Sequence, residues 1–280
     1  MRVANMRHPE GSSVHIDQAG PTKAGADLPS PWARRFHVKH QVDAEPEMEL
    51  QGLLAYLRIE LEPQKIALLV DHLRLVLAAN SRLNLTAIGD LDAGLRLHIV
   101  DSLAAYPELQ AAPAGPYADL GAGAGYPGIP LGVASERPTM LVESVRKKAD
   151  FLRQTVSELA LGSLVGVYPG RAEGLARTQA GGFSVVTARA VAQLASLVEL
   201  ACPLLREGGS FVALKGTPSA AEIAQGDSAA QRLGMRRQSL RTLVLPGGDE
   251  SRTILSYVKF AEPDIALPRA DGRAQHHPLA

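Results

Sequence analysis

The 280-residue chain has a single cysteine, Cys202, and aromatic residues make up only 4% of it. One cysteine excludes a disulfide scaffold, a cysteine-ligated zinc cluster and a CxxC redox site. No apolar run reaches the roughly 20 residues of a membrane-spanning helix, and the N-terminus lacks the apolar stretch of a secretory signal. Neither sign of charge is in excess, because Lys plus Arg and Asp plus Glu both number 29. We therefore expect a soluble, cytoplasmic protein without a membrane partner or a metal site.

The pattern of residue types divides the chain into four parts. Residues 1–46 and 262–280 are rich in Gly, Pro, His and charge without an apolar period, which predicts a disordered extension and a disordered tail. Residues 47–112 carry leucines at helical spacing, so we expect a helical region there, with one of its helices over 91–106. Residues 113–261 form the remaining and largest part.

Short apolar runs of strand length alternate with helical stretches within residues 113–261. The strands are predicted at 117–121, 140–143, 164–168, 183–187 and 209–214, with helices at 145–161 and 193–205 between them. Such alternation is typical of an α/β fold whose parallel sheet is covered on both faces. Two further strands, 240–245 and 252–259, flank the turn sequence PGGDE and predict an antiparallel hairpin at the end.

The strongest local signal is DLGAGAGYPG at 119–128, where a strand runs into a glycine loop. Gly123, Gly125 and Gly128 match the G-x-G-x-x-G pattern of dinucleotide sites, but Gly121 already ends the strand, which puts that pattern out of register. The alternative ligand is S-adenosylmethionine (SAM). Asp119 suits its ammonium group, and Glu143, which ends the next strand, could accept both ribose hydroxyls. We favour SAM, although a purely structural turn is also compatible with these glycines.

Seven motifs then point to one family. They are NLTAI (84–88), LHIVDSL (97–103), DLGAGAGYPGIPL (119–131), KKADFLRQ (147–154), GRAE (170–173), ARA (188–190) and ALKG (213–216). In this order and spacing they resemble the RsmG (GidB) family of bacterial small-subunit rRNA methyltransferases, from about residue 48 to 260. Ala79 departs from the tryptophan that the family often has, and residues 1–46 have no counterpart in its common core.

This resemblance implies a class I SAM-dependent methyltransferase fold, Rossmann-like, with a mostly parallel seven-stranded sheet and an antiparallel C-terminal hairpin. It implies methylation of guanine-527 at N7, in the 530 loop of 16S rRNA, with SAM as the methyl donor. The resemblance also implies cofactor-binding positions. Together with Asp119 they form one predicted set: Asp119, Gly121, Gly123, Tyr126, Glu143, Ser144, Ala172, Glu173 and Arg189.

Guanine N7 carries a free lone pair, so this reaction needs positioning of two reactants and no general base. Three residues are predicted to position the reactants: Arg189, Lys215 and Asn84. Arg189 is expected to pair with the SAM carboxylate or an RNA phosphate, unless it forms a salt bridge with a neighbouring acid. His98 and Asp101, three residues apart, could form a catalytic pair; we interpret them instead as a tie between the helical region and the α/β core.

Basic residues exceed acidic ones in the α/β part, with 15 Lys or Arg against nine Asp or Glu over residues 146–259. We predict an rRNA-facing set of Arg146, Lys147, Lys148, Arg171, Arg236 and Arg237, to which Arg153 and Arg241 could add. The expected partner is 16S rRNA or the small ribosomal subunit, bound by a monomer. Two other functions remain open from the residues: a dinucleotide-dependent oxidoreductase, and a non-catalytic assembly factor that binds RNA.

Overall fold

The computed structural model describes residues 45–189 and 192–279. Residues 1–44 of the predicted extension lie outside the described residues. The centre of the structure is a seven-stranded sheet in the order β3-β2-β1-β4-β5-β7-β6. The strands are β1 (Tyr117–Leu120), β2 (Thr139–Val142), β3 (Val165–Tyr168), β4 (Phe183–Arg189), β5 (Leu205–Lys215), β6 (Met235–Val244) and β7 (Ser251–Lys259). The first five pair in parallel and β7 pairs antiparallel with both β5 and β6, which confirms the predicted α/β sheet and its closing hairpin.

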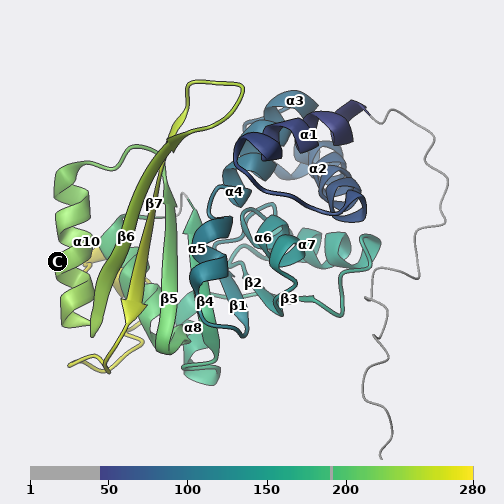
Figure 1. The fold of residues 1–280 in the computed structure, drawn as a ribbon. Helices are drawn as coiled ribbons and strands as arrows, with labels where there is room; N and C mark the ends of the chain where they lie inside the picture. The colour runs from purple at the N-terminus through teal and green to yellow at the C-terminus, as the bar shows by residue number, and fades with distance from the viewer. Residues whose placement is uncertain (1–44, 190–191, 280) are drawn as a thin grey trace, which may run out of the picture. The chain divides into compact units, whose positions relative to one another are not determined.

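Helices cover both faces of this sheet (Figure 1). The helices α6 (Gly128–Ser135) and α7 (Arg146–Glu158) follow β1 and β2 and lie on one face. The other face carries α8 (Ala172–Thr178), α9 (Leu194–Ala201) with the 3₁₀ turn η3 (Cys202–Leu204), and α10 (Ala220–Arg232). Because β1 pairs in parallel with both β2 and β4, the carboxyl ends of these three strands meet at one edge.

The helical region packs against the face that carries α6 and α7. It consists of α1 (Glu45–Tyr56), α2 (Pro63–Leu83), α3 (Leu91–Gly94), η2 (Leu95–Val100), α4 (Asp101–Leu103) and α5 (Tyr106–Ala111). The helix expected over 91–106 is therefore not regular: its central six residues form a π-helical turn. Such wide turns are rare and occur often at functional sites, and this one carries His98.

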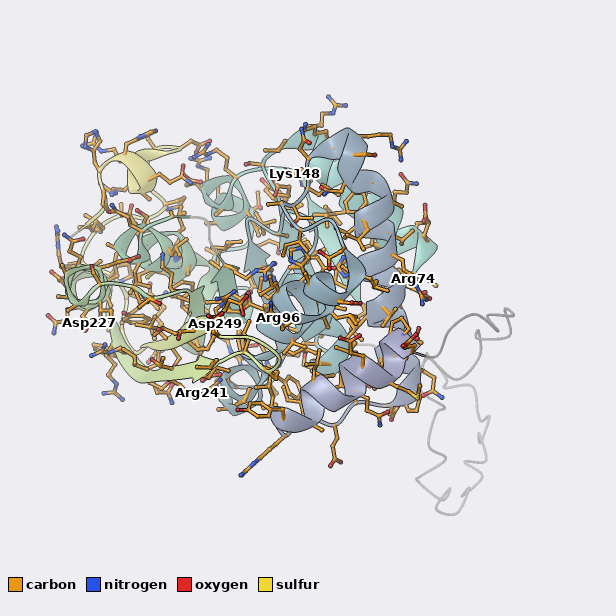
Figure 2. The ribbon with its side chains drawn as sticks, turned by 90° about the horizontal axis from the view of Figure 1, so that it is seen from above. Arg74, Arg96, Lys148, Asp227, Arg241 and Asp249 are labelled. Atoms are coloured by element: carbon orange, nitrogen blue, oxygen red, sulfur yellow. The ribbon has the colours of Figure 1, made fainter. Side chains whose placement is uncertain are left out.

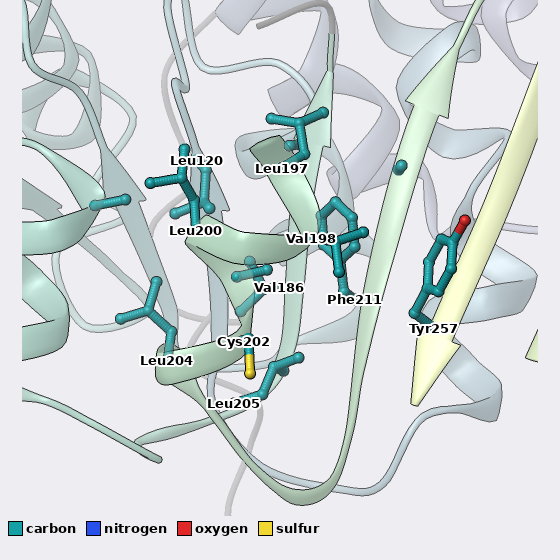
Figure 3. Packing of buried hydrophobic residues seen from close by; sticks show 14 of the residues in the cluster. Leu120, Val186, Leu197, Val198, Leu200, Cys202, Leu204, Leu205, Phe211 and Tyr257 are labelled. Carbon is teal, nitrogen blue, oxygen red and sulfur yellow. The ribbon is translucent and has the colours of Figure 1, made fainter. Parts of the chain in front are cut away.

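Apolar side chains from β1, β4, β5, β7 and α9 fill the core on the α9 face (Figure 3). Its aromatic members include Phe211 and Tyr257, which lie with ring centroids 6.3 Å apart. Cys202 belongs to this cluster and is fully buried, and burial raises the pKa of its thiol to about 11. The thiol is thus a core group, as its apolar sequence context predicts.

The C-terminal segment differs from the sequence-based expectation of a disordered tail. Residues 262–279 lie against the protein, end in the short helix α11 (Arg273–His276), and bury Ala274 and Leu279 in the core. Arg269 forms an ion pair with the buried Glu199, and this long-range contact has no signal in local composition. Among the described residues, no helix is long and apolar enough to cross a membrane.

Candidate functional site

The glycine loop after β1 has a backbone that only glycine adopts readily. Gly121, Gly123 and Gly125 have φ values of 70°, 59° and 99°, in the left-handed region that side chains disfavour. The amides of Gly121 and Ala122 both donate to the carbonyl of Val142 at the end of β2, at 2.9 and 3.1 Å. The loop therefore curls over the carboxyl ends of β1 and β2 and leaves its outer face open to a ligand.

Asp119 fixes this loop from below. Its carboxylate is fully buried, accepts the amide of Gly128 at 2.9 Å and accepts the hydroxyl of Thr187 at 2.7 Å. Burial raises the pKa of Asp119 to about 7, against the opposing effect of these two hydrogen bonds. A Cβ on Gly128 would lie 2.8 Å from its Oδ2, so glycine is required there. Asp119 is not among the described residues that line the two cavities, so its expected contact with the ligand ammonium stays a prediction.

Glu143 reaches across the same loop from the end of β2. Its Oε2 accepts the amide of Gly123 at 2.9 Å, and its Oε1 accepts the amide of Val145 at 2.7 Å. Only 5% of the residue is exposed. Each carboxylate oxygen has a second lone pair, so Glu143 can hold the loop and still accept hydroxyl groups from a ligand.

A large cavity of about 530 Å³ opens between the glycine loop and the helical region. The loop contributes Gly121, Gly123 and Tyr126 to its wall, and β4 and β5 contribute their last residues, Arg189 and Lys215. The helical region supplies Leu85, Thr86, Leu97, His98 and Asp101. The predicted positioning residue Asn84 is not among the described lining residues: it ends α2 with a φ of 49°, and its neighbours Leu85 and Thr86 face the cavity in its place.

A smaller cavity of about 140 Å³ lies on the other side of Gly121, which lines both. It is bounded by Ser144 after β2 and by Ala172 and Glu173 at the start of α8, three residues of the predicted cofactor-binding set. The two cavities together follow the carboxyl edge of β3, β2, β1, β4 and β5. This is the edge at which open α/β sheets bind their ligands.

The floor of the larger cavity is an aromatic stack that sequence reasoning did not find. The ring of Tyr126 lies between His72 and His98, with centroids 4.6 Å from each, and the guanidinium of Arg189 lies 5.6 Å from its centre. The Nε2–H of His72 donates to the carbonyl of Ala124 at 2.8 Å. These contacts of His72 are visible only in the tertiary fold, because in the sequence His72 is one polar residue on a largely apolar helix.

Both histidines of the stack are neutral at pH 7. Burial lowers the pKa of His72 to about 4, and burial with the nearby charge of Arg189 lowers the pKa of His98 to about 4. Nε2 of His98 lies 2.9 Å from the hydroxyl of Thr86. Within residues 45–189 and 192–279, the buried hydroxyl of Tyr126 and the Nδ1 atoms of both histidines have no hydrogen-bond partner. Unsatisfied buried polar atoms beside a cavity are ready for a polar ligand.

Arg189 pairs with a neighbouring acid, one of the two alternatives that the sequence left open. Its Nη1 donates to Oδ2 of Asp101 and to the carbonyl of Leu97, both at 3.1 Å. Arg252 donates its Nε–H to the other oxygen of Asp101 at 2.8 Å. Asp101 therefore ties the helical region to β4 and β7, which confirms the structural interpretation of this residue.

Lys215 is also engaged within the protein. Its ammonium group donates to the carbonyl of Ala192 at 2.9 Å and lies 2.8 Å from Oε1 of Glu222. It nevertheless lines the larger cavity at the end of β5, as predicted.

The predicted rRNA-facing residues are not brought together. Arg146, Lys147 and Lys148 begin α7, next to Glu143, and the first two are exposed. Arg236 and Arg237 lie opposite Val258 and Tyr257, which pair with the middle of β5, whereas the cavity adjoins its last residues. Lys148 accordingly lies far from Asp227, the partner of Arg237, in Figure 2. These two arginines thus lie on the edge strand β6, away from the cavities.

Two more predicted basic residues are committed to contacts within the chain. Arg171 lies with its Nε 3.6 Å from Oε2 of Glu173 and donates to Gln275. Arg241 forms a two-pronged ion pair with Glu108 at 2.9 and 2.8 Å. Neither therefore offers a free guanidinium to a phosphate.

Comparison with known proteins identifies a family and relatives that are similar to this chain in sequence. A family model described as GidB, rRNA small subunit methyltransferase G, matches residues 65–253. The protein named Ribosomal RNA small subunit methyltransferase G from Chloroflexus aggregans is 42% identical over 203 residues, which cover 71% of this chain and 84% of the relative. The protein of the same name from Deinococcus radiodurans is 40% identical over 212 residues, covering 74% and 83%.

Among solved structures, a branched-chain polyamine synthase mutein from Thermus thermophilus is similar in fold. The TM-score is 0.50 at 13% identity, and the match covers 64% of this chain and 62% of that one. At this identity the likeness extends to the fold alone.

Proposed function

The chain belongs to the GidB family, that of rRNA small subunit methyltransferase G, and we propose that it transfers the methyl group of SAM to N7 of a guanine in the 530 loop of 16S rRNA. The family assignment contradicts the dinucleotide-dependent oxidoreductase alternative. The observation that carries the proposal is the pair of cavities that share Gly121, together with Glu143, which accepts the amide of the lining residue Gly123.

The two cavities suit the two ends of SAM. The smaller one, beside Ser144, Ala172 and Glu173, fits the adenine end, and the larger one fits the methionine end and the target base. Glu143 lies between Val142 and Ser144, which line the smaller cavity, and accepts the amide of Gly123, which lines the larger one. Its free lone pairs are proposed to accept the ribose hydroxyls.

Bound SAM supplies a methyl group on a positively charged sulfur. The protein's own contribution is to hold this group in line with guanine N7, about 3 Å away. Because N7-methylguanine is cationic, a free positive charge beside it would disfavour the product. His98 and His72 are neutral, and the carboxylate of Asp101 offsets part of the positive charge of Arg189 and Arg252, which lessens this penalty.

We propose that Arg146 and Lys147 bind rRNA phosphates at the entrance to the site. They are exposed, they follow Glu143 directly, and they lie at the N-terminal end of α7, whose dipole also favours an anion. Arg236 and Arg237, on the edge strand β6, provide a control, because replacing both removes the same charge away from the site.

The double variant Arg146→Ala/Lys147→Ala is expected to raise KM for the small subunit several-fold and to leave kcat little changed. Losing two phosphate contacts should also reduce the slope of log affinity against log salt by roughly 1.5. Methyl transfer measured at several salt concentrations checks both numbers. The double variant Arg236→Ala/Arg237→Ala is expected to match the wild type, and the reverse ranking would contradict the assignment.

The test of the reaction is transfer of tritium from methyl-labelled SAM to RNA. We expect incorporation into 16S rRNA that comes from cells lacking this modification, offered either as naked RNA or as small subunits. RNA that already carries the methyl group should take up no label. Transfer to neither form would contradict the proposed function. We also propose that the protein acts in the cytoplasm, where its ribosomal substrate resides, and that it acts as a monomer. Sedimentation analysis checks the oligomeric state.

A further inference from the structure

The C-terminal segment 262–279, here called the C-terminal strap, lies beyond residues 65–253 that the family model matches. It is fixed to α8 and α9 by three long-range contacts. Arg269 donates twice to the carboxylate of Glu199, at 2.6 Å each, and Asp271 pairs with Arg177. Because Glu199 is 3% exposed and Arg269 neutralises it there, the strap has a defined position.

The strap reaches the smaller of the two cavities. The amide of Gly272 donates to Oε1 of Glu173 at 2.7 Å, so the strap occupies one oxygen of a carboxylate that lines the cavity. Gln275, three residues further, is itself a lining residue, together with Ser144 and Ala172. The Nη2 of Arg171 donates to Oε1 of Gln275 at 3.0 Å. The strap therefore contributes one residue, Gln275, to the wall of this cavity and holds a second lining residue, Glu173, through its backbone.

The polar groups on this wall are incompletely satisfied. In the part of the chain that the structure describes, the buried Nε–H of Arg171 has no acceptor. The carboxamide of Gln275 carries two donors and an oxygen with two lone pairs, of which Arg171 uses one. A carboxamide can pair with an adenine edge, donating to a ring nitrogen while it accepts from the N6 amino group. A buried donor and an available carboxamide on one cavity wall match a purine base.

We propose that the strap forms part of the wall of the adenine subsite and that Gln275 recognises the adenine edge of the cofactor. This inference rests on the proposed function, since it assumes that SAM binds along the two cavities. Glu173 and Arg171 act as positioning residues: the first anchors the backbone of the strap, and the second orients the carboxamide. The strap thereby contributes to the preference of the site for a cofactor that carries adenine.

The test is calorimetric titration of the full-length protein with S-adenosylhomocysteine and with S-inosylhomocysteine, which carries an oxygen in place of the N6 amino group. Gln275→Ala is expected to bind S-adenosylhomocysteine about tenfold more weakly, the effect of losing paired hydrogen bonds. The wild type should prefer the adenine compound, and the variant should lose most of that preference. His276→Ala, which removes a neighbouring exposed side chain from the same helix, is the matched control and should behave as the wild type.

The two proposals fail in distinguishable ways. If the wild type binds S-adenosylhomocysteine and Gln275→Ala binds both compounds as the wild type does, the strap is a structural element only and this inference is wrong. If the wild type does not bind S-adenosylhomocysteine at all, the proposed function is contradicted together with the inference. Since Gln275 is exposed and outside the core, the variant should keep the fold, which circular dichroism verifies.

Discussion

Replacing Glu143 with alanine is expected to weaken the binding of S-adenosylhomocysteine by at least about 100-fold. The carboxylate accepts the amides of Gly123 and Val145 and is the proposed acceptor of the ribose hydroxyls of the cofactor. A hydrogen bond to a charged acceptor contributes about 2 kcal/mol, so the loss of two from the ribose amounts to ~4 kcal/mol, of which relaxation recovers part. Every 1.4 kcal/mol corresponds to a factor of ten in affinity. Calorimetric titration of the purified variant measures the change.

The control for this variant removes a carboxylate of the same kind from the far end of the helix that follows Glu143. Glu158, at the end of α7, is exposed, and its recorded side-chain partner is Gln154. Glu158→Ala should bind S-adenosylhomocysteine as the wild type does. If Glu143→Ala bound the ligand within about twofold of the wild type while remaining folded, Glu143 would not be the ribose-binding residue.

Replacing Asp101 with alanine is expected to lower the free energy of unfolding by about 3 kcal/mol and to reduce methyl transfer sharply. Asp101 is 4% exposed and holds the guanidinium groups of both Arg189 and Arg252. Removing one partner of a buried ion pair leaves an uncompensated charge, which costs about 3–5 kcal/mol; partial exposure of the arginines places the effect at the low end. Activity falls as well, because Arg189 then presents a free positive charge to the cationic product. Urea denaturation and transfer assays measure the two effects.

Asp92 offers a matched comparison in α3, at the start of the same helical run. It is exposed, and Asp92→Ala should change the free energy of unfolding by less than about 0.5 kcal/mol. Asp101→Asn keeps one acceptor for an arginine, so it should lie between the alanine variant and the wild type. Equal stability of Asp101→Ala and the wild type would show that this contact does not join the helical region to the sheet.

The sheet and the glycine loop were predictable because their signals are local. Alternating apolar runs indicate strands and helices wherever they occur, and PGGDE between two strands predicts a hairpin from five residues. The positive φ values of Gly121 and Gly125 explain why glycines stand there. Glu143 could be placed because the end of one parallel strand lies beside the end of the next.

The contacts that the sequence did not reveal are long-range. The strap is held by Arg269 on Glu199, 70 residues apart, in a segment whose composition resembles that of a disordered tail. His72 meets the carbonyl of Ala124, 52 residues away, and the aromatic stack exists only once α2 lies on the loop. The positions of Arg236 and Arg237 relative to the site depend on how β6 pairs with β7, and their charge in the sequence does not indicate that pairing.

The most direct test of the central claim is to locate the modified nucleotide in 16S rRNA. Unmodified small subunits are treated with the wild-type protein and SAM, and the RNA is then cleaved chemically at N7-methylguanine and read by primer extension. We predict a cleavage at guanine-527 in the 530 loop that is absent after treatment with Glu143→Ala. Methylation at another nucleotide or another atom, or none with the wild-type protein, would contradict the account.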